Sequence, residues 1–81
     1  MKYRWVLHAE AVEFFQGLKK RQRARLIRAF ETLSRHPFVE PKARGTDSAH
    51  GDFELVVIDT MSVTYHADHA VRIIHVFRFD V

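Results

Sequence analysis

The sequence predicts a small α+β domain in which a helical hairpin packs on one face of a mainly antiparallel four-stranded sheet. Two apolar stripes with helical spacing occupy the first half of the chain, and segments rich in β-branched and aromatic residues occupy the last third. A short alternating segment precedes the helices, so the element order is β-α-α-β-β-β. Helices and sheet form two layers because each buries its apolar side against the other. With 81 residues and no repeat, residues 1–81 make one domain.

The N-terminal half begins with a strand and continues as two helices. Apolar and polar side chains alternate loosely from Tyr3 to Leu7. From Ala9 the apolar residues recur at helical spacing, namely at Ala11, Phe14, Phe15 and Leu18. A second stripe consists of Leu26, Ile27, Phe30 and Leu33. The first stripe does not continue into the second, so we expect a hairpin of two helices. The second helix must end before Pro37, because the residue ahead of a proline is biased away from helical geometry.

The C-terminal half is expected to begin with a loop and to continue as an antiparallel meander. Residues 38–51 are rich in proline, glycine, aspartate and serine, which favour turns. Three strand-like segments follow, Asp52–Ile58, Met61–Ala67 and Val71–Phe79. The links between them are short enough for hairpin turns.

Alternation along these strands assigns their residues to two faces. The helix-facing side is expected to hold Phe53, Leu55, Val57, Val63, Tyr65, Ala67, Val71, Ile73, Phe77 and Phe79. The open face is expected to hold Glu54, Ser62, Thr64, His66, Arg72 and Arg78, together with Val56, Ile58, Ile74 and Val76. His75 falls on the core side, where its imidazole needs a hydrogen-bond partner.

The chain is basic, and one segment carries much of its positive charge. Residues 19–28 hold six of the 13 lysines and arginines and no acid, within a net charge of +3. Such a helix suits nucleic acid or an acidic protein segment, and a solvated helix face is the alternative. The chain has no cysteine for disulfide or thiolate chemistry. It also has no long apolar run or signal peptide, so we expect a cytoplasmic protein without membrane contact.

The layout and several short segments resemble the RelE/ParE superfamily of bacterial type II toxin–antitoxin systems. The segments are Leu33-x-x-x-Pro37, Arg44-Gly45, Gly51-Asp52-Phe53-Glu54-Leu55, Val63 to Asp68 and Val71 to Arg78. The resemblance covers nearly the whole chain and implies a toxin that a cognate antitoxin neutralises by wrapping around it. RelE-like members cleave mRNA, mostly on the ribosome, without a metal or other cofactor, whereas ParE-like members act on DNA gyrase.

The resemblance also indicates which residues would carry the chemistry. Lys42 and Arg44 lie in the loop where relatives carry basic residues, and Arg78 matches an arginine near the end of the last strand. Relatives commonly place a tyrosine or histidine several residues after that arginine, and this sequence ends at Val81 without one. A second hypothesis is therefore a non-catalytic binding protein of the same fold, either a gyrase inhibitor or a toxin relative that only binds its antitoxin. A plain nucleic-acid-binding module is a third.

Metal-free RNA cleavage needs a base for the ribose 2′-hydroxyl, an acid for the leaving 5′-oxygen and cations for the developing charge. We predict that His66 acts as acid or base on the open face, and that Arg78 and Arg44 stabilise charge. Lys42 and Arg72 would hold RNA. The basic helix would do so as well, through Lys19, Lys20, Arg21, Arg23, Arg25 and Arg28.

The other histidines receive structural assignments. His50 is expected to belong to a turn beside Gly51, and the alternative is that it swings from this turn into a site. His66, Asp68 and His69 are close in sequence but straddle a hairpin turn, and no further ligand completes a metal shell, so no metal is expected.

Overall fold

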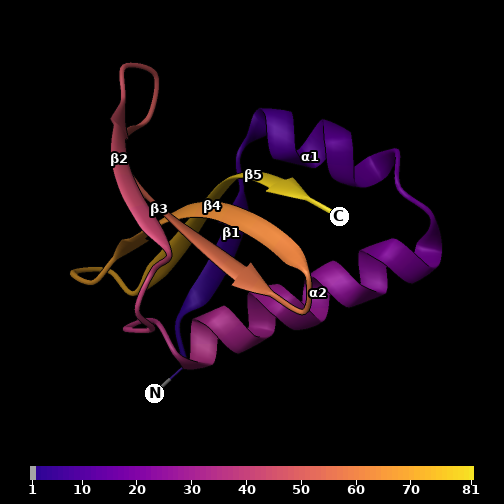
Figure 1. Ribbon diagram of the computed structural model, residues 1–81, viewed down its shortest axis with the longest axis horizontal. Coiled ribbons are helices and arrows are strands. Elements are labelled where there is room, and N and C mark those ends of the chain that lie inside the picture. Colours follow the sequence, from indigo (N-terminus) through magenta and orange to yellow (C-terminus); the bar gives the residue numbers. More distant parts are fainter. Residues whose placement is uncertain (1) are drawn as a thin grey trace.

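The computed structural model describes residues 2–81 and contains the expected helical hairpin over one face of a sheet (Figure 1). The elements in chain order are β1 (Arg4–Leu7), α1 (Ala9–Gln16), α2 (Lys20–Arg35), β2 (Ala43–Asp47), β3 (Gly51–Ile58), β4 (Met61–Asp68) and β5 (Ile73–Asp80). The strand order is β1-β5-β4-β3-β2, in which β1 runs parallel to β5 and the other neighbours are antiparallel. Among the described residues, neither helix is long and apolar enough to cross a membrane.

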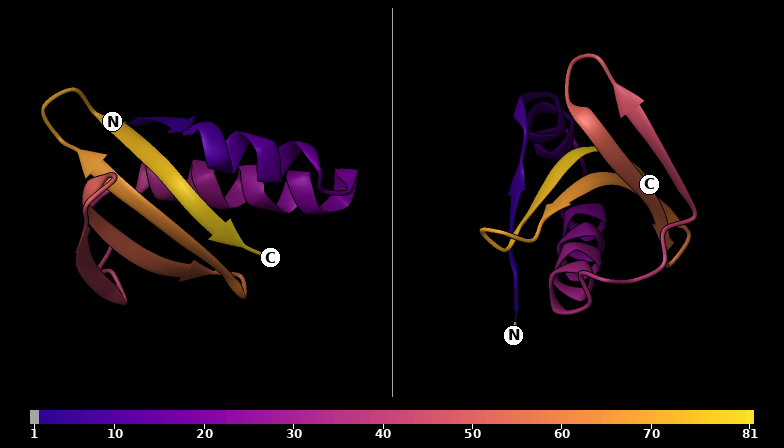
Figure 2. Two further views of the ribbon diagram at one scale, coloured as in Figure 1. Left: turned by 90° about the horizontal axis from the view of Figure 1, so that it is seen from above. Right: turned by 90° about the vertical axis from the view of Figure 1, so that its left-hand side faces the viewer.

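The core lies between the helices and the sheet, and among the described residues α2 and β4 each contribute four buried side chains to it (Figure 2). Leu26, Phe30 and Leu33 of α2 are buried, as their spacing predicts. The Phe30 ring contacts Trp5 of β1 and Phe79 of β5, with centroid distances of 5.0 and 5.9 Å. Each such side chain contributes about 1.5–3 kcal/mol when it leaves water, so packing rather than helix propensity holds α2 on the sheet.

The boundaries of the helices follow local signals. Residues 17–19 separate α1 from α2, which confirms the hairpin. At the end of α2, the His36 N–H donates to the carbonyls of Thr32 and Leu33 at 3.1 and 3.2 Å. His36 itself has left helical geometry, with φ −128° and ψ 61°, because Pro37 follows.

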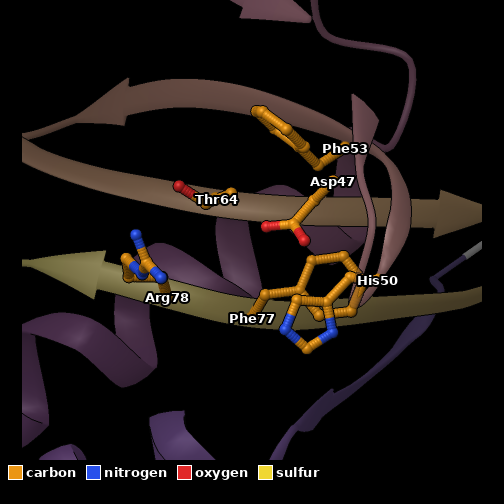
Figure 3. A pocket seen from close by; sticks show the side chains of 6 residues that line it. All are labelled: Asp47, His50, Phe53, Thr64, Phe77 and Arg78. Atoms are coloured by element: carbon orange, nitrogen blue, oxygen red, sulfur yellow. The ribbon is translucent and has the colours of Figure 1, made fainter. Parts of the chain in front are cut away.

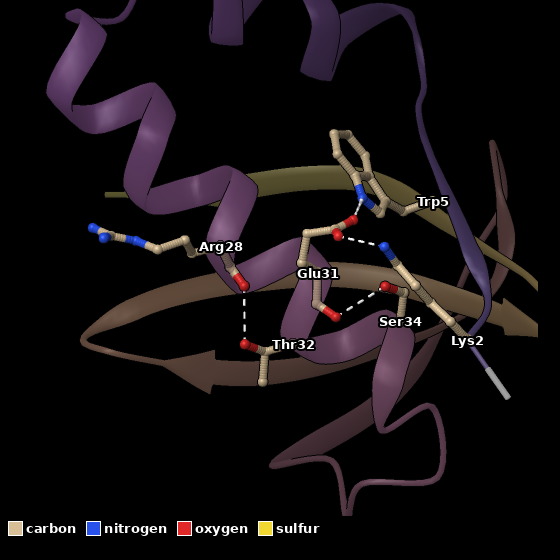
Figure 4. Close-up of polar contacts among 6 residues, drawn as sticks. All are labelled: Lys2, Trp5, Arg28, Glu31, Thr32 and Ser34. Carbon is tan, nitrogen blue, oxygen red and sulfur yellow. Dashed lines mark hydrogen bonds and ion pairs between the residues drawn. The ribbon is translucent and has the colours of Figure 1, made fainter.

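Glu31 fastens the edge strand β1 to α2 (Figure 4). The indole N–H of Trp5 donates to Glu31 Oε2 at 2.7 Å, and the Lys2 ammonium donates to Oε1. The hydrogen bond from Lys2, followed by that from Trp5, lowers the pKa of Glu31. The carboxylate therefore keeps its charge, and its hold on β1, into moderately acidic solution.

The sheet has five strands rather than the predicted four, because β2 forms within the segment expected to be a loop. It pairs antiparallel with β3, and Gly45 lies opposite Phe53. The Phe53 ring covers this glycine so closely that a Cβ there would lie 2.6 Å from a ring carbon. The five residues of β2 contain no apolar alternation, so pairing with β3 determines the strand rather than its own sequence.

The faces of β3 are the reverse of the prediction. Val56 is buried opposite Val63 of β4, and Ile58 packs against the core, although both were predicted on the open face. The side chains predicted to face the helices but found on the outer side are Phe53, Leu55 and Val57. Residues 55–58 are all apolar, so the sequence does not show which alternate residues face the helices. Only packing across the sheet determines this choice.

A β-bulge explains the error in β5. Ile74 and Val76 are fully buried, although alternation predicts them on the open face. Phe77 is then an extra residue of β5 without a partner on β4. A bulge reverses the phase of the residues beyond it, and Phe79 is accordingly buried, as predicted.

The same phase error affects the beginning of β5. Val71 precedes the strand and is 59% exposed, so its predicted core position is wrong. Ile73 and His75 lie on the outer side, because they alternate with the buried Ile74 and Val76. His75 is thereby placed opposite His66 of β4 rather than in the core.

Candidate functional site

A cavity of about 120 Å³ opens where the β2–β3 turn meets β4 and β5 (Figure 3). Its lining residues are Asp47, His50, Phe53, Thr64, Phe77 and Arg78. They come from four strands and one turn, so the cavity exists only once the sheet has closed. Thr64 points away from the buried Val63 and Tyr65, which places the cavity on the outer side of β4.

The bulge in β5 builds one wall of this cavity. In a regular strand Phe77 and Arg78 would point to opposite faces, whereas here both line the cavity. Arg78 is exposed and lies opposite Thr64. Within residues 2–81, no carboxylate forms an ion pair with Arg78. Its planar guanidinium can therefore bind a phosphate with two parallel hydrogen bonds.

Three histidines form a cluster beside Phe77, and two of them contact its ring. His50 stacks on the Phe77 ring, with centroids 4.4 Å apart and planes 14° apart. His8, at the start of α1, meets the same ring edge-on at 4.8 Å. His8 Nε2 also lies 3.1 Å from Nδ1 of His75, so one imidazole donates a hydrogen bond to the other. The sequence predicts His50 in a turn and His75 in the core, and it gives His8 no role. The cluster could not be predicted, because it forms only by tertiary contact.

The surroundings of His8 favour its neutral imidazole. Burial, and then the neighbouring His75 and His50, lower the pKa of His8. A neutral His8 can share a single proton with His75, as their hydrogen bond requires. Imidazole is the side chain that most readily exchanges protons near neutral pH, and His50 presents one at the cavity. Among the described residues, no group of three or more potential ligands is arranged to hold a metal ion.

A second depression adjoins the cavity and contains His66 and Arg44. Its lining residues are Arg44, Gly45, Thr46, Asp52, Phe53, Glu54 and His66. His66 Nδ1 lies 3.5 Å from Glu54 Oε2, and neither atom has a hydrogen-bond partner or contact with solvent. Nearby, burial and then the charge of Glu54 raise the pKa of Tyr65 to about 12, so this phenol stays protonated and serves the core.

The three predicted catalytic residues thus divide between two neighbouring depressions. Arg78 lines the first with His50, whereas Arg44 and His66 line the second. Phe53 belongs to both and forms the wall between them. The sequence correctly placed His66 and Arg78 on the outer face, but it did not show that His50 lies at the same cavity as Arg78.

Lys42 and Arg72, predicted to hold RNA, lie outside both depressions. Lys42 immediately precedes β2, and its N–H donates to the Leu55 carbonyl at 2.7 Å. Arg72 was predicted on the open face of a strand but lies in the turn before β5, at the opposite end of that strand from Arg78. Its backbone has φ 59°, and its carbonyl accepts the Arg4 N–H at 3.0 Å.

Two of the six cations in the basic segment have structural partners. The Arg23 guanidinium donates to the Leu18 carbonyl, and Arg25 lies 3.3 Å from the Asp59 carboxylate in the β3–β4 turn. The exposed members of the segment are Lys19, Lys20, Arg21 and Arg28. They belong to the helical layer, whereas the cavity lies on the outer side of β4, so they form a separate basic surface.

Comparison with protein-family models and with curated proteins finds no match. Solved structures do superpose on the chain. The archaeal RelE–RelB complex from Pyrococcus horikoshii aligns with a TM-score of 0.72 and 19% identity, over 99% of this chain and 94% of that one. The RelBE2 toxin–antitoxin complex from Mycobacterium tuberculosis gives 0.73 and 20%, over 99% and 98%. A mutant of the E. coli toxin RelE in the free state gives 0.76 and 16%, over 99% and 83%. The chain has the RelE fold, as its sequence predicted.

Proposed function

We propose that this protein is the toxin of a toxin–antitoxin pair and that it inhibits translation by cleaving mRNA on the ribosome without a metal. The observation that carries the proposal is the cavity on the outer side of the sheet that both Arg78 and His50 line. The likeness to RelE structures, two of them solved as toxin–antitoxin complexes, supports a cognate antitoxin as partner.

The residues at the two depressions suit the chemistry of RNA cleavage. His50 accepts the proton of the ribose 2′-hydroxyl, and the 2′-oxygen attacks phosphorus. The bond from phosphorus to the 5′-oxygen breaks, and His66 returns a proton to that oxygen. The products are a 2′,3′-cyclic phosphate and a 5′-hydroxyl. Arg78 binds the charge that develops on the phosphate oxygens, and Arg44 holds the neighbouring phosphate of the strand.

The exposed cations of α2 supply the electrostatic part of binding. Lys19, Lys20, Arg21 and Arg28 suit ribosomal RNA phosphates or acidic segments of the antitoxin. Contacts to RNA phosphates weaken steeply with salt because bound counterions are released. Binding to the ribosome should therefore fall by at least tenfold between about 50 and 200 mM salt.

A translation extract with a defined mRNA tests the proposal. We expect the purified protein to cut the message, and we expect Arg78→Ala, His50→Ala and His66→Ala each to lower the rate by roughly 100-fold or more. Arg35→Ala removes an exposed cation from the far end of α2 and should cleave normally. Intact mRNA with the wild type, or equal rates in all four variants, contradicts the assignment.

One observation favours a second function, a non-catalytic binding protein of the same fold. Arg78 is the one cation among the six residues that line the cavity. A protein of this kind would act on a target such as DNA gyrase, or would only bind its antitoxin. It would leave mRNA intact in the extract, and a gyrase inhibitor would block DNA supercoiling at the concentration that is toxic to cells.

A further inference from the structure

We infer that the cavity beside Arg78 selects a guanine base, whose Watson–Crick edge is bound by the carboxylate of Asp47. The inference rests on the proposed function, because it identifies the part of an RNA substrate that enters this cavity. It goes beyond that function in naming the base adjacent to the scissile phosphate.

The walls of the cavity suit a flat aromatic ligand. Phe53 forms one wall, and Phe77 with its stacked His50 forms the other. Figure 3 shows the Asp47 carboxylate between these two sets of rings. Proteins read single-stranded RNA by stacking splayed bases on such side chains and by hydrogen bonding their edges.

Asp47 gives the cavity its selectivity. Its Oδ1 accepts the Ala49 N–H at 2.6 Å, which fixes the carboxylate in the turn. A carboxylate accepts several hydrogen bonds through its two oxygens, so acceptor sites remain for a ligand. This anion would repel phosphates, and the ligand must compensate with hydrogen-bond donors. The cavity therefore suits a nucleobase edge that carries donors rather than acceptors.

Guanine is the base that presents such an edge. Its N1–H and N2–H₂ lie side by side and match the two oxygens of a carboxylate. Adenine and cytosine each pair an amino donor with a ring nitrogen acceptor, and uracil flanks its single N–H with two carbonyls. Each of these three would place an acceptor against the negative charge.

Arg78 complements this choice of base. Arg78 lies on the far side of Thr64 when seen from Asp47 (Figure 3). The guanidinium and the carboxylate therefore occupy different sides of the cavity. Arg78 is thereby available to the phosphate attached to the base, as in the proposed reaction, while Asp47 determines which base enters.

Titration of the full chain with 5′-GMP, 5′-AMP, 5′-CMP and 5′-UMP, followed by calorimetry or by the imidazole NMR signals, tests the inference. We expect GMP to bind at least tenfold more tightly than the others. Asp47→Asn should abolish the preference while it keeps the turn, because the asparagine carbonyl still accepts the Ala49 N–H. Asp52→Asn is the matched control: it removes the same charge from the same hairpin, but Asp52 lines the second depression and accepts the Thr46 hydroxyl at 3.2 Å.

The outcomes separate the two proposals. Equal affinity for the four nucleotides, or a GMP preference that survives in Asp47→Asn, overturns the guanine assignment. Selective GMP binding that Asp47→Asn removes, in a protein that leaves mRNA intact, supports the guanine site and rejects the nuclease. Cleavage of mRNA without a preference for guanine at the cut does the reverse.

Discussion

A single methyl group at Gly45 should damage the proposed site without unfolding the protein. A Cβ at this position lies 2.6 Å from Phe53 Cζ, about 1 Å inside the contact distance of roughly 3.5–4 Å between carbons. Phe53 is only half-buried, so its ring can withdraw, and Gly45→Ala should cost about 1 kcal/mol, at the low end of overpacking effects. The same 1 Å shift moves a wall of the cavity, and errors of that size lower reaction rates by up to about 100-fold.

Urea unfolding and the mRNA cleavage assay together measure these two effects. We expect Gly45→Ala to stay folded without urea, with a midpoint lowered by roughly 0.3–1 M, and to cleave at least tenfold more slowly. Gly17→Ala is the control, because its Cβ would lie an ordinary 3.6 Å from the nearest atom and its φ of −80° suits alanine. That variant should cleave normally and gain up to about 1 kcal/mol of stability. A folded Gly45→Ala protein with the wild-type rate would refute the placement of Phe53 in the functional site.

Three further predictions concern the fold and its pH dependence. Val56→Ala should lower the free energy of unfolding by about 2 kcal/mol and Val57→Ala by less than about 0.5, because only Val56 is buried; equal urea midpoints would contradict the β3 register. Because the pKa of His8 lies below 6.5, folded protein binds fewer protons, so stability should fall as pH drops below that value, and His8→Gln should flatten the urea midpoint between pH 7.5 and 5.5. The lowered pKa of Glu31 stabilises the fold above pH 4.5, so Glu31→Gln should be less stable at pH 7, and this deficit should vanish as acid protonates the wild-type carboxylate.

The layered architecture could be predicted because its signals are local. The apolar spacing of the two helices and the proline after α2 specify a hairpin without reference to the rest of the chain. β2 could not be predicted in the same way. Its residues Ala43–Asp47 include a glycine and an aspartate, and the strand depends on pairing with β3 and on the Phe53 ring over Gly45. Both of these are tertiary contacts.

The histidine cluster was beyond sequence reasoning for a similar reason. His8 and His75 are hydrogen-bonded across 67 positions of sequence, and His50 approaches them from a turn. The available signal was compositional, since six histidines in 81 residues is a high number for a small domain. The position of His66 on the outer side of β4 was predicted correctly, because the side chains of this strand alternate without a bulge of its own.

The bulge at Phe77 accounts for both the error in β5 and the existence of the cavity. Ile74, Val76 and Arg78 have the same parity, so strict alternation puts all three on one face. An unbulged β5 would bury Ile74 and Val76 only by carrying Arg78 under the helices as well. An unpaired guanidinium there would cost several kcal/mol. The extra residue lets the strand fill the core and still present Arg78 outside, beside Phe77. The bulge is therefore what creates the cavity, and in β5 the alternating pattern fails at the residues to which we assign the proposed function.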